Sequence, residues 1–100
     1  MDLGCFQEEI HNRAMPTLEG FDPLLDGHYR DRTDAVRKCA LAASKRGYPV
    51  FALQHSGYCT SSSDGLSTYN KYGEADHCDG DGEGGSGALR VYKFITGKPN

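Results

Sequence analysis

The sequence predicts an α+β domain in which one amphipathic helix packs on a small, mainly antiparallel sheet. Two observations indicate this class: a helical apolar stripe at about residues 33–46, and two apolar, strand-like runs that follow it. The chain has 100 residues, 37% hydrophobic, and 13 glycines, which favours a small core with many loops. We expect a single domain over residues 1–100, with an ordered core at 4–95 and a tail at 96–100.

The predicted helix begins after an oxygen-bearing side chain, Asp31 or Thr33, that can cap its first turn. Its apolar residues recur at i, i+3, i+4 and i+7, which places them on one face: Val36, Cys39, Ala40 and Ala43. Gly47 supplies the left-handed residue that ends many helices, and Pro49 prevents continuation. This helix and the apolar run that follows it should set the core.

Several strands are expected around the helix, including a return that starts at Tyr58-Cys59 after a turn at residues 55–57. A short strand at residues 3–7 is anchored by Cys5, and a brief second strand at Ala14-Met15 ends before a proline. Residues 50–54 form an apolar run typical of a central strand, and residues 89–95 alternate as a terminal strand does. The pairing of these strands is expected to be mainly antiparallel.

Two long segments lack a periodic pattern. Residues 17–31 contain two glycines and a proline, and we interpret them as a loop attached to the core by apolar anchors: Phe21, Leu24, Leu25 and Tyr29. Residues 60–87 are dominated by Ser, Gly, Asp and Tyr and form the second predicted loop. Candidate binding chemistry gathers in this second loop rather than in the core.

Four widely spaced cysteines predict two disulfides and hence an oxidising, extracellular compartment. Three pairings are possible; we favour Cys39–Cys59, which would tie the helix to its strand, and Cys5–Cys78, which would tie the outer segments. Four unrelated thiols in a reducing compartment are the alternative. A net charge of −3 without a basic stripe argues against nucleic acid, and no run approaches the ~18 apolar residues of a membrane span.

An acidic, glycine-rich segment suggests a calcium site. Asp79, Asp81 and Glu83 alternate with glycines, so the chain could wrap oxygen ligands around a hard cation. Arg90 stands where an EF-hand loop would need its bidentate Glu, so a standard EF-hand is rejected. We expect a looser Ca²⁺ site that draws on Asp76, Asp64 or backbone carbonyls; the alternative is a solvated acidic loop whose composition reflects only turn chemistry.

Tyrosines near predicted turns suggest a glycan site. Sugars offer an apolar ring face that stacks on an aromatic side chain, and hydroxyls that meet polar groups. Candidate ligand residues combine both: Tyr58, Asp64, Tyr69, Asn70 and Tyr72. Tyr48 and the serines at 61–63 are interleaved with this set. Each tyrosine could instead bury its ring and leave only the hydroxyl in water.

Several of these residues stand in a familiar order. Gly4-Cys5-Phe6, Asn12-Arg13-Ala14, a helix with Cys39, Gly47-Tyr48-Pro49-Val50-Phe51 and Gly57-Tyr58-Cys59 resemble the first half of a WSC domain. WSC domains are extracellular cysteine-rich modules, akin to PAN/apple modules and associated with carbohydrate binding. Thr60-Ser61 follows Cys59 where that family has a paired Cys-x-Cys, and this chain has about half the family's cysteines. The resemblance implies a helix on a small sheet and a binding role.

These patterns predict a secreted module that binds glycan or an extracellular protein. Carbohydrate binding, with Ca²⁺ as a cofactor, is the leading interpretation; a structural adhesion or matrix module is the first alternative, and a small secreted toxin or inhibitor is the second. An enzyme is not expected, because the four histidines are scattered and no serine has a partnered base.

Overall fold

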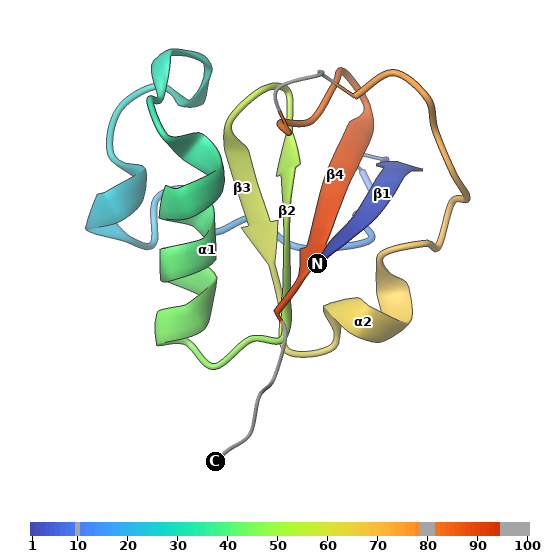
Figure 1. Ribbon diagram of the computed structural model, residues 1–100, viewed down its shortest axis with the longest axis horizontal. Helices are drawn as coiled ribbons and strands as arrows, with labels where there is room; N and C mark the ends of the chain where they lie inside the picture. Colours follow the sequence, from blue (N-terminus) through green and yellow to red (C-terminus); the bar gives the residue numbers. More distant parts are fainter. Residues whose placement is uncertain (10, 79–81, 95–100) are drawn as a thin grey trace.

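The computed structural model, which describes residues 1–9, 11–78 and 82–94, confirms the α+β class. Helix α1 (Ala35–Lys45) packs on one antiparallel sheet with the strand order β1-β4-β2-β3 (Figure 1). The strands are β1 (Asp2–Gln7), β2 (Val50–Gln54), β3 (Tyr58–Ser61) and β4 (Ala88–Lys93). Short elements complete the fold: the 3-10 turns η1 (Pro23–Leu25) and η2 (Tyr29–Asp31), and α2 (Gly65–Thr68). The prediction that residues 50–54 form a central strand is confirmed.

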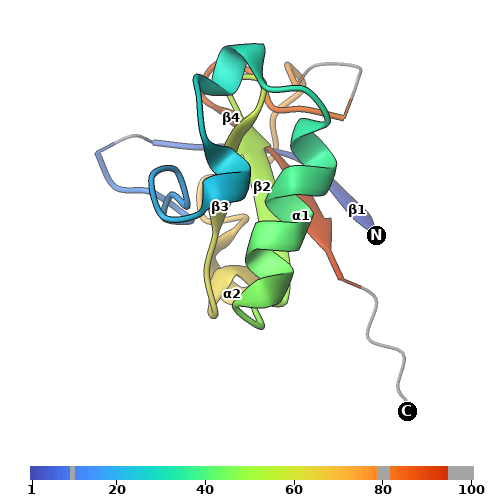
Figure 2. The ribbon, with the colours of Figure 1, turned by 90° about the vertical axis from the view of Figure 1, so that its left-hand side faces the viewer.

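The sheet is covered on both faces, so the core has two halves. Along β2 the side chains alternate: Phe51 and Leu53 pack toward α1, whereas Val50 and Ala52 pack on the opposite face. The α1 half contains the Cys39–Cys59 pair. The other half contains Met15 and Phe6 together with Leu89 and Val91 of β4. Figure 2 shows α1 lying along one side of the sheet.

Short extended segments cover both sheet edges. Pro16 and Leu18 exchange backbone hydrogen bonds with Ser61 and Cys59, at 2.9 and 3.0 Å, along the outer edge of β3. At the other edge, β1 bonds to residues 73–75 through contacts of 2.9 Å. Because unpaired edges are templates for aggregation, these segments protect the sheet.

The structure corrects the predicted second strand at Ala14-Met15. Pairing with β3 begins instead at Pro16, because the backbone N–H groups of Ala14 and Met15 are bound by the Glu8 carboxylate, at 2.7 and 3.4 Å. Glu8 is only 5% exposed and also accepts a bond from the Glu9 N–H. A buried carboxylate six residues away therefore competes with the sheet for these donors.

The predicted helix is correct in place but not in its cap or in its buried face. Neither Asp31 nor Thr33 caps it: Asp31 ends η2, and the N-cap is Asp34, which has a left-handed backbone and no side-chain capping bond. The fully buried residues are Ala35, Cys39, Ala42 and Ala43, so the core-facing stripe is rotated from the expected one. Val36 and Ala40 lie at its margin, only partly buried.

The loop at residues 17–31 also differs from expectation in its anchors. Leu25 is buried as predicted, but Phe21 is 69% exposed and Leu18 takes the buried place. The segment predicted as a loop at 60–87 contains the short helix α2, whose first residue, Gly65, approaches Val50 so closely that a Cβ would lie 2.4 Å from its side chain. The tail predicted at 96–100 lies outside the described residues.

Both favoured disulfides are confirmed. Cys39–Cys59 joins α1 to β3 inside the core, and Cys5–Cys78 joins β1 to the segment before β4. The bonded residues are 20 and 73 positions apart, so chain entropy alone gives about 3 and 4 kcal/mol of stabilisation. That is a large contribution for a domain with a small core.

The Glu8 carboxylate gives a stability prediction. We expect Glu8→Gln to lower the free energy of unfolding by about 1 to 3 kcal/mol. The amide NH₂ of Gln is a donor, so it would face a backbone N–H that now donates its hydrogen bond to a carboxylate oxygen. Urea denaturation of the purified protein measures this change. Glu9→Gln is the matched control, since Glu9 is exposed, and its effect should stay below about 0.5 kcal/mol. Equal effects of the two variants would contradict the role assigned to Glu8.

Candidate ligand-binding site

A pocket of about 340 Å³ opens where the end of β3, the C-terminal end of α1 and residues 16–21 meet. Two aromatic side chains line it, Phe21 and Tyr48, together with the apolar Pro16 and Leu18. Its polar lining consists of Thr17, Arg46 and the three serines at 61–63. We call this the Phe21 pocket. It combines an apolar wall with convergent hydroxyl groups, as ligand pockets commonly do.

The exposed ring of Phe21 is carried by a fixed backbone. Arg46 donates one hydrogen bond to the Phe21 carbonyl, at 2.6 Å, and another to Asp22 Oδ2, at 2.8 Å. Lys45 Nζ lies 3.0 Å from the same carboxylate oxygen, and Asp22 Oδ1 accepts from the Leu24 N–H. The last turn of α1 thus holds the segment that presents Phe21, with cations at the negative end of the helix dipole.

This buried carboxylate is strongly acidic. The hydrogen bond from Arg46, helped by those from the Leu24 N–H and Lys45, lowers the pKa of Asp22 to about 2 from its usual 3.8. Asp22 therefore stays ionised at any pH near neutrality and keeps both cations in place. Both terminal nitrogens of the Arg46 guanidinium donate hydrogen bonds within the protein, to Asp22, the Ala42 carbonyl and the Phe21 carbonyl, so this side chain serves to shape the pocket wall.

The pocket also holds hydroxyls that are available to a ligand. Ser61 Oγ donates to the Val50 carbonyl, and Ser62 Oγ donates to Asp64 Oδ1. Among the described residues, the hydroxyls of Tyr48 and Ser63 have no hydrogen-bond partner. These two groups can exchange water for ligand hydroxyls without breaking an internal bond.

The residues predicted to bind sugar lie in different places. Tyr69 packs edge-on against Phe6, with ring centroids 4.9 Å apart, and Tyr72 donates its hydroxyl to the Asn12 carbonyl, so both help to close the second half of the core. Asn70 is exposed just after α2. Asp64 adjoins the Phe21 pocket through its bond from Ser62. Tyr58 stands apart, at the turn between β2 and β3.

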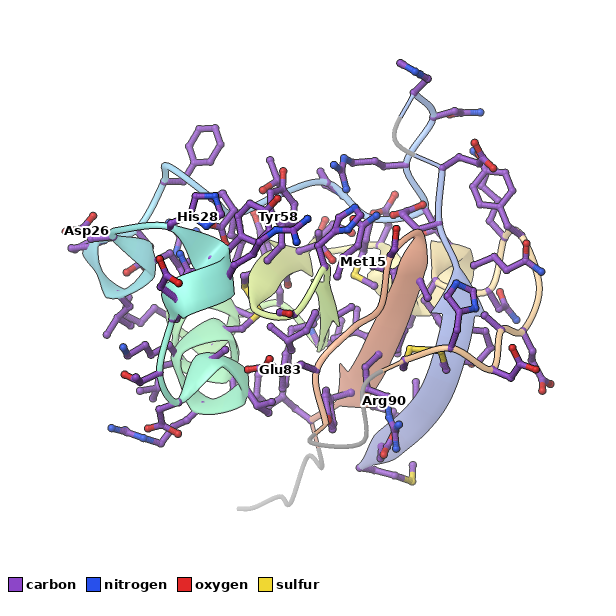
Figure 3. All side chains as sticks on the ribbon, turned by 90° about the horizontal axis from the view of Figure 1, so that it is seen from above. Met15, Asp26, His28, Tyr58, Glu83 and Arg90 are labelled. Carbon is purple, nitrogen blue, oxygen red and sulfur yellow. A yellow bond between two sulfur atoms is a disulfide. The ribbon has the colours of Figure 1, made fainter. Side chains whose placement is uncertain are left out.

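Tyr58 belongs to an aromatic and cationic cluster at that turn. The guanidinium of Arg13 lies 5.1 Å from its ring centroid, and Tyr29 packs edge-on against it at 5.0 Å. His28 stacks on the other side of Tyr29, at 4.6 Å. Figure 3 looks onto this end of the molecule and shows His28 and Tyr58 close together. The ring of Tyr58 is therefore largely occupied by protein groups.

The predicted calcium ligands are only partly described. Asp79 and Asp81 lie outside the described residues, while Glu83 is half-buried and lies just before a backbone bridge between Gly84 and Ser56. In the part of the chain that the structure describes, no three His, Cys, Asp or Glu side chains gather closely enough to hold a metal ion. Asp76 is exposed, with His77 Nδ1 3.8 Å away. The calcium site stays a prediction.

Comparison with known proteins gives no relative from which function could be transferred. No protein-family model and no curated protein matches this chain. The resemblance to WSC domains therefore stays a prediction, and function has to be inferred from the geometry above. Within residues 1–9, 11–78 and 82–94, no helix is long and apolar enough to cross a membrane.

None of the five predicted sugar ligands lines the Phe21 pocket, although residues interleaved with them in the sequence do. Tyr48 and the serines at 61–63 are interleaved with the predicted ligands, whereas Phe21 is predicted as an anchor onto the core and Arg46 lies outside the predicted set. The local sequence does indicate that Phe21 is exposed. It stands between Gly20 and Asp22-Pro23, a turn-forming context that predicts a place at the surface. Nothing local indicates the contact with Arg46, which spans 25 residues.

The lowered pKa of Asp22 predicts a pH-dependent stability. Its folded pKa of about 2 lies below its usual 3.8, so its ion pairs stabilise the fold fully above pH 3.8 and this contribution is lost as the pH falls through about 2. We expect Asp22→Asn to lower the free energy of unfolding by about 1 to 3 kcal/mol at pH 7, with the difference shrinking toward pH 2.

Thermal or urea unfolding of both proteins across this pH range measures the effect. Asp26→Asn is the matched control, because Asp26 is an exposed carboxylate in the same loop. A difference between Asp22→Asn and the unsubstituted protein that did not change with pH would contradict the assignment.

Proposed function

We propose that this protein is a secreted carbohydrate-binding module and that the Phe21 pocket holds the sugar. The observation that carries the proposal is the 69% exposed side chain of Phe21, beside Tyr48 and Ser63 hydroxyls that have no hydrogen-bond partner within the described part of the chain. The faces of pyranose rings are lined by C–H groups that stack on aromatic rings, while their hydroxyls need polar partners. This pocket offers both on one wall.

The fixed backbone distinguishes Phe21 from an ordinary exposed side chain. Single apolar residues on a protein surface are common and need no functional explanation. Here, however, Arg46 and Asp22 fix the backbone that carries the ring, so stacking would cost little further conformational entropy. A preorganised aromatic wall of this kind supports selective binding of a rigid ring.

The size and chemistry of the pocket favour binding over catalysis. Its volume of about 340 Å³ is near the lower limit of typical ligand pockets, which suits one or two sugar rings at a chain end. Its one charged lining group, Arg46, is already bonded to Asp22 and to backbone carbonyls. The two disulfides support an oxidising, extracellular location.

Removal of the Phe21 ring tests the proposal. We expect Phe21→Ala to weaken binding of a glycan identified on an array by roughly tenfold or more, because the stacking surface is lost. Isothermal titration with that glycan measures the change. Leu41→Ala is the matched control, since Leu41 is a 40% exposed apolar residue on α1 outside the pocket, and it should change affinity by less than about twofold.

The same variants separate the alternatives. If no glycan binds, but the protein self-associates or captures a matrix protein in a manner that needs Phe21, the adhesion alternative is favoured. Inhibition of a target protein through that surface would favour the inhibitor alternative. Glycan binding that survives Phe21→Ala would move the sugar away from this pocket, toward Tyr58 or the residues after α2.

We further propose that Ca²⁺ binds at Glu83 together with Asp79 and Asp81. Because a ligand that binds only the folded state stabilises it, millimolar Ca²⁺ should raise the melting temperature, and Glu83→Gln should reduce that rise. Scanning calorimetry with Ca²⁺, with Mg²⁺ and with EDTA measures it. Glu74→Gln, which changes an exposed carboxylate elsewhere, is the control. An unchanged melting temperature on addition of Ca²⁺ would contradict the calcium site.

A further inference from the structure

A second, smaller pocket lies at the other end of β3, against the turn between β2 and β3. Its volume is about 120 Å³, which corresponds to about four water molecules or one tetrahedral oxyanion. Arg30, His55, Ser56 and Ser86 line it, and the backbone of Gly84 and Gly85 closes it. We call this the hairpin pocket. It is separate from the Phe21 pocket, with which it shares no lining residue.

The hairpin pocket is electropositive, although the chain as a whole carries a net charge of −3. Within the described residues, Arg30 makes no ion pair; its guanidinium lies 5.7 Å from the ring centroid of Tyr29. Arg13, nearby, bonds to the neutral Gln54 Oε1 at 2.7 Å and likewise has no carboxylate partner there. Burial, Arg30 and Arg13 together lower the pKa of His55. Arg30 and Arg13 disfavour the protonated, cationic form of His55, and the same positive potential favours an anion.

The wall of the pocket is rigid and strained. His55 and Ser56 both have a left-handed backbone, with φ of 46° and 72°, a conformation that in hairpin turns usually requires Gly or Asn. Ser56 bonds to Gly84 in both directions, at 2.9 and 3.2 Å, and the His55 N–H bonds to the Gly85 carbonyl. A Cβ on Gly84 would lie 1.9 Å from the Leu53 carbonyl, so only glycine permits this approach.

Free donors complete the pocket. The hydroxyls of Ser56 and Ser86 have no hydrogen-bond partner among the described residues. Together with the Arg30 guanidinium and the His55 imidazole, these hydroxyls supply donors from three segments of the chain. The space that they line is large enough for one anion. Donors on several sides suit the four oxygens of a tetrahedral group better than the two of a carboxylate.

We propose that the hairpin pocket is an anion-binding site that takes one tetrahedral oxyanion, a sulfate or phosphate group. The group would be carried by a larger ligand as an ester, with its oxygens bound by Arg30, Ser56 and Ser86. This proposal does not depend on the Phe21 pocket, because the two sites lie at opposite ends of β3 and can be lost separately.

Titration of the isotope-labelled full chain with inorganic sulfate, and separately with phosphate, tests the site by NMR. Saturable shifts are expected at the amides of residues 55–57 and 84–86. Arg30→Ala should weaken the affinity by roughly tenfold. Arg37→Ala is the matched control: it removes the same charge from an exposed arginine on α1 and should change the affinity by less than about twofold.

A second variant separates binding from folding. Ser56→Gly relieves the left-handed strain, so it should raise the melting temperature while it weakens sulfate binding through loss of the hydroxyl donor. Shifts that do not saturate, or equal losses in Arg30→Ala and Arg37→Ala, would overturn the site. Sulfated, phosphorylated and unmodified forms of one sugar then identify the source of the anion, since only the form bearing the recognised group should need Arg30.

Discussion

An ion pair between the buried guanidinium of Arg32 and the partly buried carboxylate of Glu19 is the interaction on which the loop side of this domain depends. The guanidinium donates to both carboxylate oxygens, at 2.7 and 2.8 Å, and to the carbonyls of Leu25 and Gly57. Glu19 also accepts from the Cys59 N–H at 2.8 Å. Burial of charge costs free energy, and the bidentate pairing and the two carbonyl contacts offset much of it, although the buried Arg32 Nε has no hydrogen-bond partner among the described residues. One contact thus fixes the loop, the hairpin turn and β3 to one another.

Both proposed sites inherit their geometry from this contact. The loop it holds carries Phe21 to one end of β3 and Tyr29 with Arg30 to the other. A loop of this length would ordinarily be mobile, and few of its apolar residues are buried. Ion pairs replace the missing hydrophobic anchors, so rings and guanidinium groups can stay at the surface and still be positioned.

The elements predicted well were those with a local cause. The helix follows from a 3.6-residue period closed by Gly47, and β2 from an uninterrupted apolar run that must be buried on both faces. The failures share a different cause. Glu8 binds the backbone of Ala14 and Met15 from six residues away, and η2 displaces the expected cap, so each local preference was overridden by a contact that no local pattern records.

The sequence by itself determined the fold class, the two inner strands and the cysteines available for disulfides, because periodicity and residue chemistry act over short distances. Only the tertiary structure decided which aromatic rings are free and which cations lack a partner. Tyr69 and Tyr72 are occupied by the core while Phe21 is exposed, and Arg32 forms an ion pair whereas Arg30 forms none within the described part of the chain. These outcomes depend on contacts across 13 to 63 residues. Composition, which marks the tyrosines as candidates, carries no information about distance in the fold.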